Sequence, residues 1–210
     1  MTGTLRTERL ILRAPAEDDI DAIYRACQDP DIQRFTLVPV PYTRGDAEHF
    51  VRVTAAAPES VTRVITTRDG DFVGCIGVVE RGDGEGSLGY WCTPAQRGRG
   101  YLSEALRAVV DDALSPQGQG LCWLSWSALP ANEASARLAA RAGFRYGGLR
   151  VHRNKGRDEV VATASLGVAD DRTPQQWPPI RARSAKMWAR SAGKWARSAK
   201  MWARSAIRRG

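Results

Sequence analysis

One stretch decides the fold: residues 88–114 read LGYWCTPAQRGRGYLSEALRAVVDDAL. A short apolar run ends at Pro94, a glycine-rich turn follows, and a helix is expected after Gly100. Beyond Glu104 the apolar side chains recur at three- and four-residue spacing, which places them on one helical face turned toward a core. They are Ala105, Leu106, Val109, Val110, Ala113 and Leu114. The stretch therefore predicts a strand, a tight turn and an amphipathic helix.

The turn before this helix is suited to an anion. Gly98 and Gly100 let the backbone approach a ligand with no Cβ in the way, and the first amide groups of the helix have no internal partners. Such a terminus favours a phosphate, and Arg97 and Arg99 add positive charge. We therefore expect residues 97–103 to bind a pyrophosphate. The alternative is an ordinary surface loop that starts a helix.

The order of residues in this stretch resembles the acetyl-coenzyme A (acetyl-CoA) signature of the GNAT superfamily of N-acetyltransferases. It looks most like the branch that holds the ribosomal-protein N-terminal acetyltransferases. The superfamily pattern is Arg/Gln-x-x-Gly-x-Gly/Ala, so Leu102 departs from it; the ligand contact there is made by the backbone amide, and a larger side chain can point away. The residues that carry the resemblance are Leu88-Gly89-Tyr90-Trp91, Pro94, Arg97-x-x-Gly100-x-Leu102 and Glu104-Ala105-Leu106.

This resemblance implies a mixed α/β domain of the GNAT fold, with one central, mostly antiparallel sheet and flanking helices. It implies acetyl-CoA as co-substrate and no metal. The amides from Gly98 to Ser103 would hold the pyrophosphate, and the strand backbone near Trp91 and Cys92 would stabilise the oxyanion. The residues expected to contact acetyl-CoA are Trp91, Cys92, Arg97, Gly98, Arg99, Gly100, Tyr101, Leu102, Ser103, Asn132 and Ser135.

Acetyl transfer needs a neutral amine, donors for the oxyanion and a proton for the leaving thiolate. Ser135 is the candidate that hydrogen-bonds the thiolate. Asn132 can face the pantetheine, cap the helix, or do both. Many superfamily members carry a Tyr seven residues after this Asn as the general acid, and here that position is Ala139. The role would then fall to Ser135 or to water.

The general base is sought among acidic residues before the Gly-Tyr-Trp element. Relatives often carry Glu just before this element, where the chain has Ser87, and Glu85 lies two residues earlier on the same strand face. Glu80 and Asp83 are further candidates, although acidic residues in such a loop are more often simply solvated. His152 could serve near neutral pH, but a histidine in a late strand is usually structural or exposed.

The other segments fit a mixed α/β domain around one sheet. Asp69-Gly70 is a hairpin signal. In relatives, residues 30–55 line the acceptor side, so Phe35, Tyr42 and His49 are candidates for substrate contact, with plain packing as the alternative. Strands are expected at 7–13, 61–67, 72–80 and 120–127, helices at 17–27, 44–52 and 132–142, an irregular segment at 31–40 and a closing hairpin at 146–166.

Length, charge and cysteines narrow the class of protein. The chain has 210 residues, enough for one domain with a real core. Its net charge of +8 is unevenly distributed: residues 173–210 hold ten of the 31 Lys and Arg and none of the 23 Asp and Glu, which gives +10 there and −2 in residues 1–172.

Four widely spaced cysteines indicate neither a zinc site nor a disulfide framework, and the apolar neighbours of Cys92 indicate packing rather than a nucleophile. With no apolar run typical of a signal peptide or a membrane span, we expect a cytoplasmic protein.

The C-terminal residues form a basic tail. From Arg183 the sequence repeats every seven residues, and Trp188, Trp195 and Trp202 share one helical face. A basic amphipathic helix with tryptophans suits RNA or an anionic membrane surface; the alternative is a duplicated appendage without a function. The sequence thus predicts an N-acetyltransferase domain at 1–172, a Pro-containing linker at 173–182 and this tail at 183–210.

Together these features predict transfer of an acetyl group from acetyl-CoA to a primary amine, by direct attack on the thioester. The amine would belong to a protein N-terminus or a small molecule, and the acceptor loops carry no motif that chooses between them. The alternative is a noncatalytic module of the same fold that acts through its tail on RNA or an anionic membrane. The oligomeric state is not indicated by the sequence.

Overall fold

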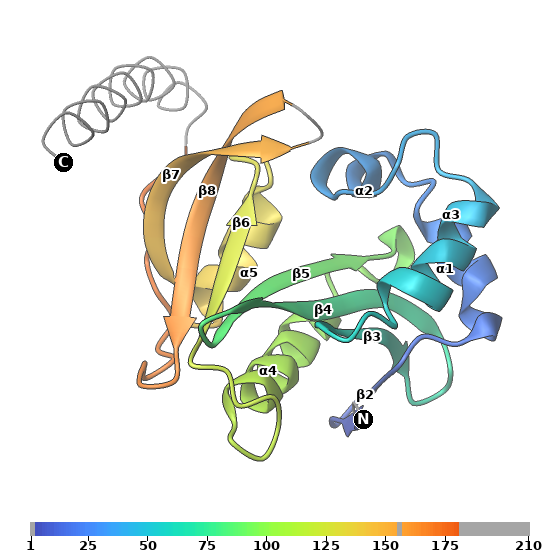
Figure 1. The fold of residues 1–210 in the computed structure, drawn as a ribbon, viewed down its shortest axis with the longest axis horizontal. Helices are drawn as coiled ribbons and strands as arrows, with labels where there is room; N and C mark the ends of the chain where they lie inside the picture. The colour runs from blue at the N-terminus through green and yellow to red at the C-terminus, as the bar shows by residue number, and fades with distance from the viewer. Residues whose placement is uncertain (1–2, 155–156, 181–210) are drawn as a thin grey trace, which may run out of the picture.

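The computed structural model describes residues 3–154 and 157–180. Within these residues the strands form one sheet in the order β1-β2-β3-β4-β5-β6-β8-β7 (Figure 1). Neighbouring strands are antiparallel except β5 and β6, which run parallel. The strands are β1 (Leu5–Arg6), β2 (Leu10–Arg13), β3 (Ser60–Thr67), β4 (Phe72–Gly82), β5 (Glu85–Cys92), β6 (Trp123–Ala128), β7 (Arg145–Asn154) and β8 (Arg157–Gly167).

Helices cover both faces of the sheet. Because successive side chains of a strand point to opposite faces, Ile65 and Ile76 pack toward α4, while Val64 and Cys75 pack toward α1 to α3. The helical segments are η1 (Glu17–Asp19), α1 (Ile20–Ala26), α2 (Pro30–Phe35), α3 (Arg44–His49), η2 (Phe50–Thr54), η3 (Pro94–Gln96), α4 (Tyr101–Leu114) and α5 (Glu133–Arg141). This arrangement confirms the predicted fold class.

The segment predicted to be irregular contains a short helix. α2 begins at Pro30, and the Asp29 carboxylate caps it by accepting from the Ile32 N–H at 3.0 Å. An Asp-Pro pair that ends one helix can also start the next, because Asp is a good N-cap and the Pro ring is preorganised for the first helical position. The irregular assignment at 31–40 was therefore wrong for its first half. This helix brings Asp31, Phe35 and Thr36 to the wall of a cavity.

Most other elements lie where the sequence placed them, with shifted ends. α4 buries the six apolar residues predicted for its inner face, and the hairpin around Gly70 joins β3 to β4. The second predicted helix stays α-helical only to His49 and continues as a π-helical turn, η2. The strand expected from residue 120 begins at Trp123.

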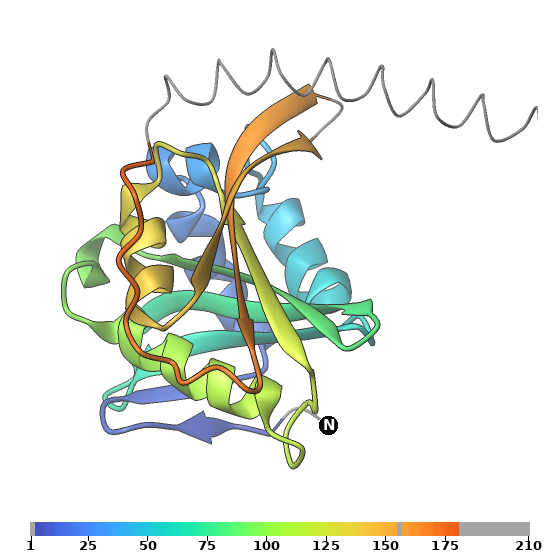
Figure 2. The same cartoon turned by 90° about the vertical axis from the view of Figure 1, so that its left-hand side faces the viewer.

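Residues 173–180 lie against the domain. The chain that follows β8 passes from α4 to α5, where the Gln175 N–H donates to the Ala140 carbonyl at 2.8 Å (Figure 2). The Trp177 indole lies 5.3 Å from the Trp126 ring and 5.5 Å from that of Tyr146, and it donates to the Phe144 carbonyl at 2.9 Å. Part of the predicted linker therefore completes the core. The predicted tail at 183–210 lies outside the described residues.

Ending the chain after residue 172 is expected to destabilise the domain, whereas ending it after residue 180 is not. The shorter form loses the Trp177 packing and its hydrogen bond, which we expect to lower the free energy of unfolding by about 2 kcal/mol and the melting temperature by about 4–8 °C. Differential scanning calorimetry of both forms checks this. Equal melting temperatures would contradict the structural role of residues 173–180.

Candidate active site

The glycine-rich loop has the conformation expected of an anion site. Gly98 and Gly100 have φ of 76° and 80°, in the left-handed region that glycine adopts without strain. α4 follows directly, with Gly100 as its N-cap. In the described part of the chain, the N–H groups from Gly98 to Ser103 donate no hydrogen bond. The loop therefore presents a row of free amide donors at the positive end of a 14-residue helix.

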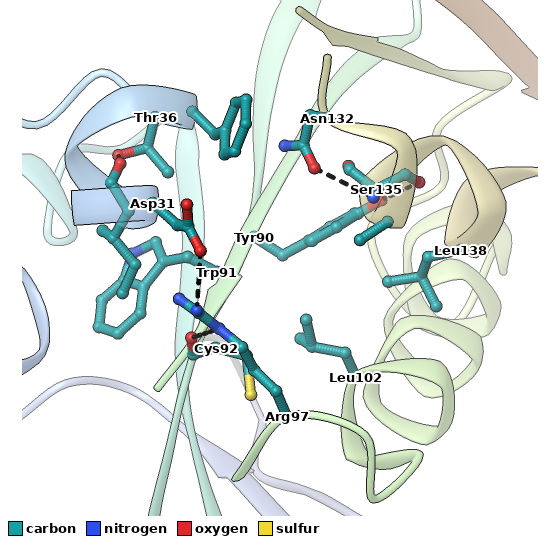
Figure 3. A pocket seen from close by; sticks show the side chains of 13 residues that line it. Asp31, Thr36, Tyr90, Trp91, Cys92, Arg97, Leu102, Asn132, Ser135 and Leu138 are labelled. Carbon is teal, nitrogen blue, oxygen red and sulfur yellow. Dashed lines mark hydrogen bonds and ion pairs between the residues drawn. The ribbon is translucent and has the colours of Figure 1, made fainter. Parts of the chain in front are cut away.

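Next to this loop, two parallel strands separate. β5 and β6 pair from Glu85–Trp123 to Leu88–Trp126, and the ladder then stops. β5 continues to Cys92 along β4, while β6 continues along β8. A cavity of about 230 Å³ lies at this divergence (Figure 3). Its lining comes from α2, the end of β5, the loop, and α4 and α5: Asp31, Ile32, Phe35, Thr36, Tyr90, Trp91, Cys92, Arg97, Leu102, Asn132, Ala134, Ser135 and Leu138.

A hydrogen-bonded cluster at the cavity wall joins β5 to α5. The Ser135 hydroxyl donates to the Tyr90 hydroxyl at 3.0 Å, and the Trp126 Nε1–H lies 3.2 Å from Ser135 Oγ and 3.1 Å from the Tyr90 oxygen. Tyr90 in turn donates to the Ser135 carbonyl at 3.2 Å. Burial raises the pKa of Tyr90 to about 12, against the opposing effect of the Ser135 and Trp126 hydrogen bonds. Both hydroxyls thus carry protons at neutral pH and lie at the cavity wall.

Asn132 caps the helix that carries Ser135. Its Oδ1 accepts from the Ser135 N–H at 3.2 Å, so it fixes the first turn of α5. Asn132 also lines the cavity, so the capping role and a role in ligand binding are compatible (Figure 3).

Comparison with protein families identifies the family and the fold of this chain. The family model for the acetyltransferase (GNAT) domain matches residues 9–145, which is more than half of the chain. This chain belongs to the GNAT family. Its members transfer an acetyl group from acetyl-CoA to an amine. Among the curated proteins, no sequence matches.

Solved structures of GNAT proteins superpose on this chain. A GNAT-family acetyltransferase from Bacillus anthracis has a TM-score of 0.70 at 19% identity, covering 80% of this chain and 100% of its own. RimL, an alpha-N-protein acetyltransferase of a ribosomal protein, in complex with coenzyme A, has a TM-score of 0.68 at 17% identity, covering 79% and 98%. Spermidine N-acetyltransferase from Vibrio cholerae, with coenzyme A and spermine, has a TM-score of 0.68 at 15% identity, covering 78% and 98%. At these identities the likeness shows the fold.

Arg97, expected to add charge at the GNAT pyrophosphate loop, is engaged elsewhere. Its guanidinium pairs with Asp29 at 2.5 Å and Asp31 at 3.1 Å, and its Nε donates to the Cys92 carbonyl at 3.2 Å. The side chain thus ties α2 to the end of β5 and forms a wall of the cavity. Neither acidic partner could be identified from sequence spacing, because both precede Arg97 by more than 60 residues.

The structure does not bring Glu85 to this cavity. Glu85 opens β5, and the first cavity residue on this strand, Tyr90, lies five positions further on, so the strand separates the two by roughly 17 Å. Glu80 and Asp83 lie near the same distant turn, between β4 and β5. The exposed His152 is on β7 and does not line the cavity.

Other predicted residues divide between the cavity and the core. Phe35 lines the GNAT cavity, whereas Tyr42 is buried among α1 to α3. Cys92 lines the cavity but is only 7% exposed, and burial raises its pKa to about 11, against the opposing charge of Arg97. This agrees with packing rather than nucleophilic chemistry. Tyr90 is the residue that sequence reasoning missed.

No group of three or more His, Cys, Asp or Glu in ranges 3–154 and 157–180 could hold a metal ion. No helix in those ranges is long and apolar enough to cross a membrane.

Proposed function

We propose that this GNAT enzyme acetylates a primary amine by direct attack of the amine on the thioester of acetyl-CoA. The observation that carries the proposal is that the loop with free amides lies next to the cavity with two hydroxyls. The loop of residues 98–103 presents free amides, and Arg97 and Leu102 of the same segment line the cavity at which the Ser135 and Tyr90 hydroxyls meet. The loop amides suit a pyrophosphate, and the two hydroxyls suit a leaving thiolate.

The residues present fit acetyl-CoA. The left-handed glycines keep side chains away from the loop amides, and the nearest atom to a Cβ built on Gly98 lies beyond 4 Å. Leu102 and Leu138 give the cavity an apolar wall that suits the pantetheine arm. When bound, acetyl-CoA supplies the activated acetyl group, and the protein binds and orients it.

Ser135 and Tyr90 stabilise the departing sulfur in this proposal. As the amine nitrogen bonds to the acetyl carbon and the carbon–sulfur bond breaks, the Ser135 hydroxyl donates a hydrogen bond to the thiolate. The surplus proton of the amine passes through water to the thiolate, which leaves as the thiol. Trp126 holds both oxygens in place. Backbone of β5 beyond Leu88, which β6 no longer pairs, is the candidate for stabilising the developing oxyanion.

No acidic residue is assigned as general base. Glu85 is too distant, and Asp31, which lines the cavity, is paired with Arg97. We propose that the amine is deprotonated by water in the part of the cavity lined by Asp31 and Thr36 from the α2 region and by Trp91 from β5 (Figure 3). The acceptor would therefore enter between α2 and β5.

Titration calorimetry with acetyl-CoA, followed by a thiol-release assay over a panel of amines, tests this function. The panel includes peptides with free N-termini and polyamines, the acceptor classes named for RimL and the spermidine enzyme. We expect micromolar binding, about −8 kcal/mol, and thiol release with at least one acceptor class. Absence of acetyl-CoA binding to the folded protein would favour the noncatalytic module instead.

Gly98→Ala is expected to weaken acetyl-CoA binding about tenfold. An L residue pays roughly 1–2 kcal/mol in the left-handed region, so the free loop relaxes and the bound conformation carries the strain. Gly45→Ala is the matched control, because Gly45 has no positive φ and its Cβ would meet only Thr43 Oγ1 at 3.7 Å. Calorimetry of both variants checks the prediction. Equal affinities would show that the loop conformation is not needed for binding.

A further inference from the structure

The turn between β1 and β2 holds the first turn of α4. The Thr7 hydroxyl donates to Glu104 Oε1 at 2.5 Å, and the Arg9 N–H donates to the same oxygen at 2.9 Å. The Arg9 Nε–H donates to the other carboxylate oxygen at 2.7 Å. Burial opposes ionisation of Glu104, whose side chain is 13% exposed, but these hydrogen bonds together lower its pKa. Glu104 is thus an ionised anchor between the sheet edge and the pyrophosphate loop.

From this anchor the Arg9 guanidinium reaches the loop itself. Its Nη1 donates to the Arg99 carbonyl at 3.1 Å, and its central carbon lies 4.9 Å from the Tyr101 ring centroid. Its Nη2 lies 3.4 Å from the position that a Cβ of Gly100 would occupy. The group is therefore fixed by a carboxylate, a carbonyl and an aromatic ring, directly beside the free amides.

One nitrogen of this guanidinium remains available. Within the described ranges Nη2 donates no hydrogen bond, and the Arg9 side chain is 47% exposed. Arg97, by contrast, has two carboxylate partners and a carbonyl. Of these two arginines, Arg9 is the one with a whole nitrogen that makes no hydrogen bond, and it pairs with one carboxylate rather than two. A planar guanidinium already held in position also loses little entropy when it binds a phosphate.

We propose that Arg9 is a ligand of the acetyl-CoA pyrophosphate, held in place by Glu104. The inference rests on the proposed function, because it needs acetyl-CoA at the loop of residues 98–103. It adds a binding residue from the N-terminal turn, about 90 positions from the loop in sequence. The residue belongs to the Thr7-Glu8-Arg9-Leu10 stretch, which has no other assigned role at the site.

The test compares two ligands that differ in phosphates. Acetyl-CoA carries the pyrophosphate, whereas S-acetylpantetheine has the same thioester and pantetheine arm but no phosphate. Affinities are measured by calorimetry for acetyl-CoA and by ligand-detected NMR for the weaker S-acetylpantetheine. The proteins are the unchanged chain, Arg9→Gln and Arg6→Gln. Arg6 is the matched control because it is exposed on β1 and its side chain makes no hydrogen bond or ion pair within the described residues.

Arg9→Gln is expected to bind acetyl-CoA about tenfold more weakly and S-acetylpantetheine as well as the unchanged chain does. Arg6→Gln should bind both ligands normally. Equal weakening toward both ligands would mean that loss of Arg9 disturbs the site as a whole, and unchanged acetyl-CoA affinity would mean that Arg9 contributes nothing; either result overturns the proposal. Failure of the unchanged protein to bind acetyl-CoA would instead refute the proposed function.

Discussion

Ser135→Ala is expected to lower kcat for acetyl transfer by about 100-fold and to leave the Kd for acetyl-CoA within about twofold. The hydroxyl is proposed to interact with the sulfur only as the carbon–sulfur bond breaks, so its loss affects the transition state more than the bound ground state. The steady-state rate of thiol release at saturating acceptor gives kcat, and calorimetry gives the Kd for acetyl-CoA. Ser127→Ala on β6 is the control, because that side chain is exposed and away from the cavity.

Tyr90→Phe removes the partner hydroxyl and is expected to lower kcat about tenfold. If the two hydroxyls act as one unit, the variant that combines Ser135→Ala with Tyr90→Phe should have about the same kcat as Ser135→Ala alone, since the effects of coupled residues are not additive. A burial-raised pKa of about 12 keeps the phenol protonated up to strongly alkaline pH, so Tyr90 should not create an alkaline limb between pH 7 and 10. Multiplicative losses, or unchanged kcat in Ser135→Ala, would contradict a shared role of the two hydroxyls at the sulfur.

The largest effect on stability is expected at Asp112. Its carboxylate pairs at 2.8 Å with Arg63, which lies in the middle of β3 with 1% exposure. The Arg63 Nε and Nη1 are buried and have no hydrogen-bond partner in the described part of the chain. Asp112→Ala therefore leaves a buried, uncompensated charge, and we expect it to lower the free energy of unfolding by about 3–5 kcal/mol.

Chemical denaturation followed by circular dichroism measures this loss. Asp111→Ala is the matched control on the same helix, because Asp111 pairs with Arg172 at the surface and should contribute less than about 1 kcal/mol. Replacing both partners, Arg63→Met with Asp112→Ala, should recover most of the lost stability, since neither variant residue needs a charged partner. A small loss for Asp112→Ala would show that water compensates Arg63.

The sequence predicted those elements that depend on residues close together in the chain. The spacing of apolar residues predicted α4, and the glycines before it predicted the tight turn that precedes this helix. The site was harder to predict from the sequence, because its polar contacts join distant parts of the chain. Tyr90 meets Ser135 across 45 residues, and Arg9 meets Glu104 across 95. A strand pattern can suggest that Tyr90 faces the core, but it cannot say which hydroxyl the phenol reaches.

The Glu85 prediction shows a related difficulty. The family pattern and the strand face were both reasonable reasons to consider it, yet the relevant quantity was its position along β5. A strand advances about 3.3 Å per residue, so a few positions decide whether a carboxylate reaches the cavity. That position depends on where β5 and β6 stop pairing, at Leu88 and Trp126, which is a property of the assembled sheet.

The packing of Trp177 on Trp126 has a practical consequence for assays on shortened proteins. Trp126 is the indole that holds Ser135 and Tyr90, and Trp177 lies against its ring. A fragment that ends at residue 172 folds without this support, so its serine would be less well oriented and its measured turnover would underestimate that of the enzyme. Enzymological work on the isolated catalytic domain should therefore retain residues up to 180.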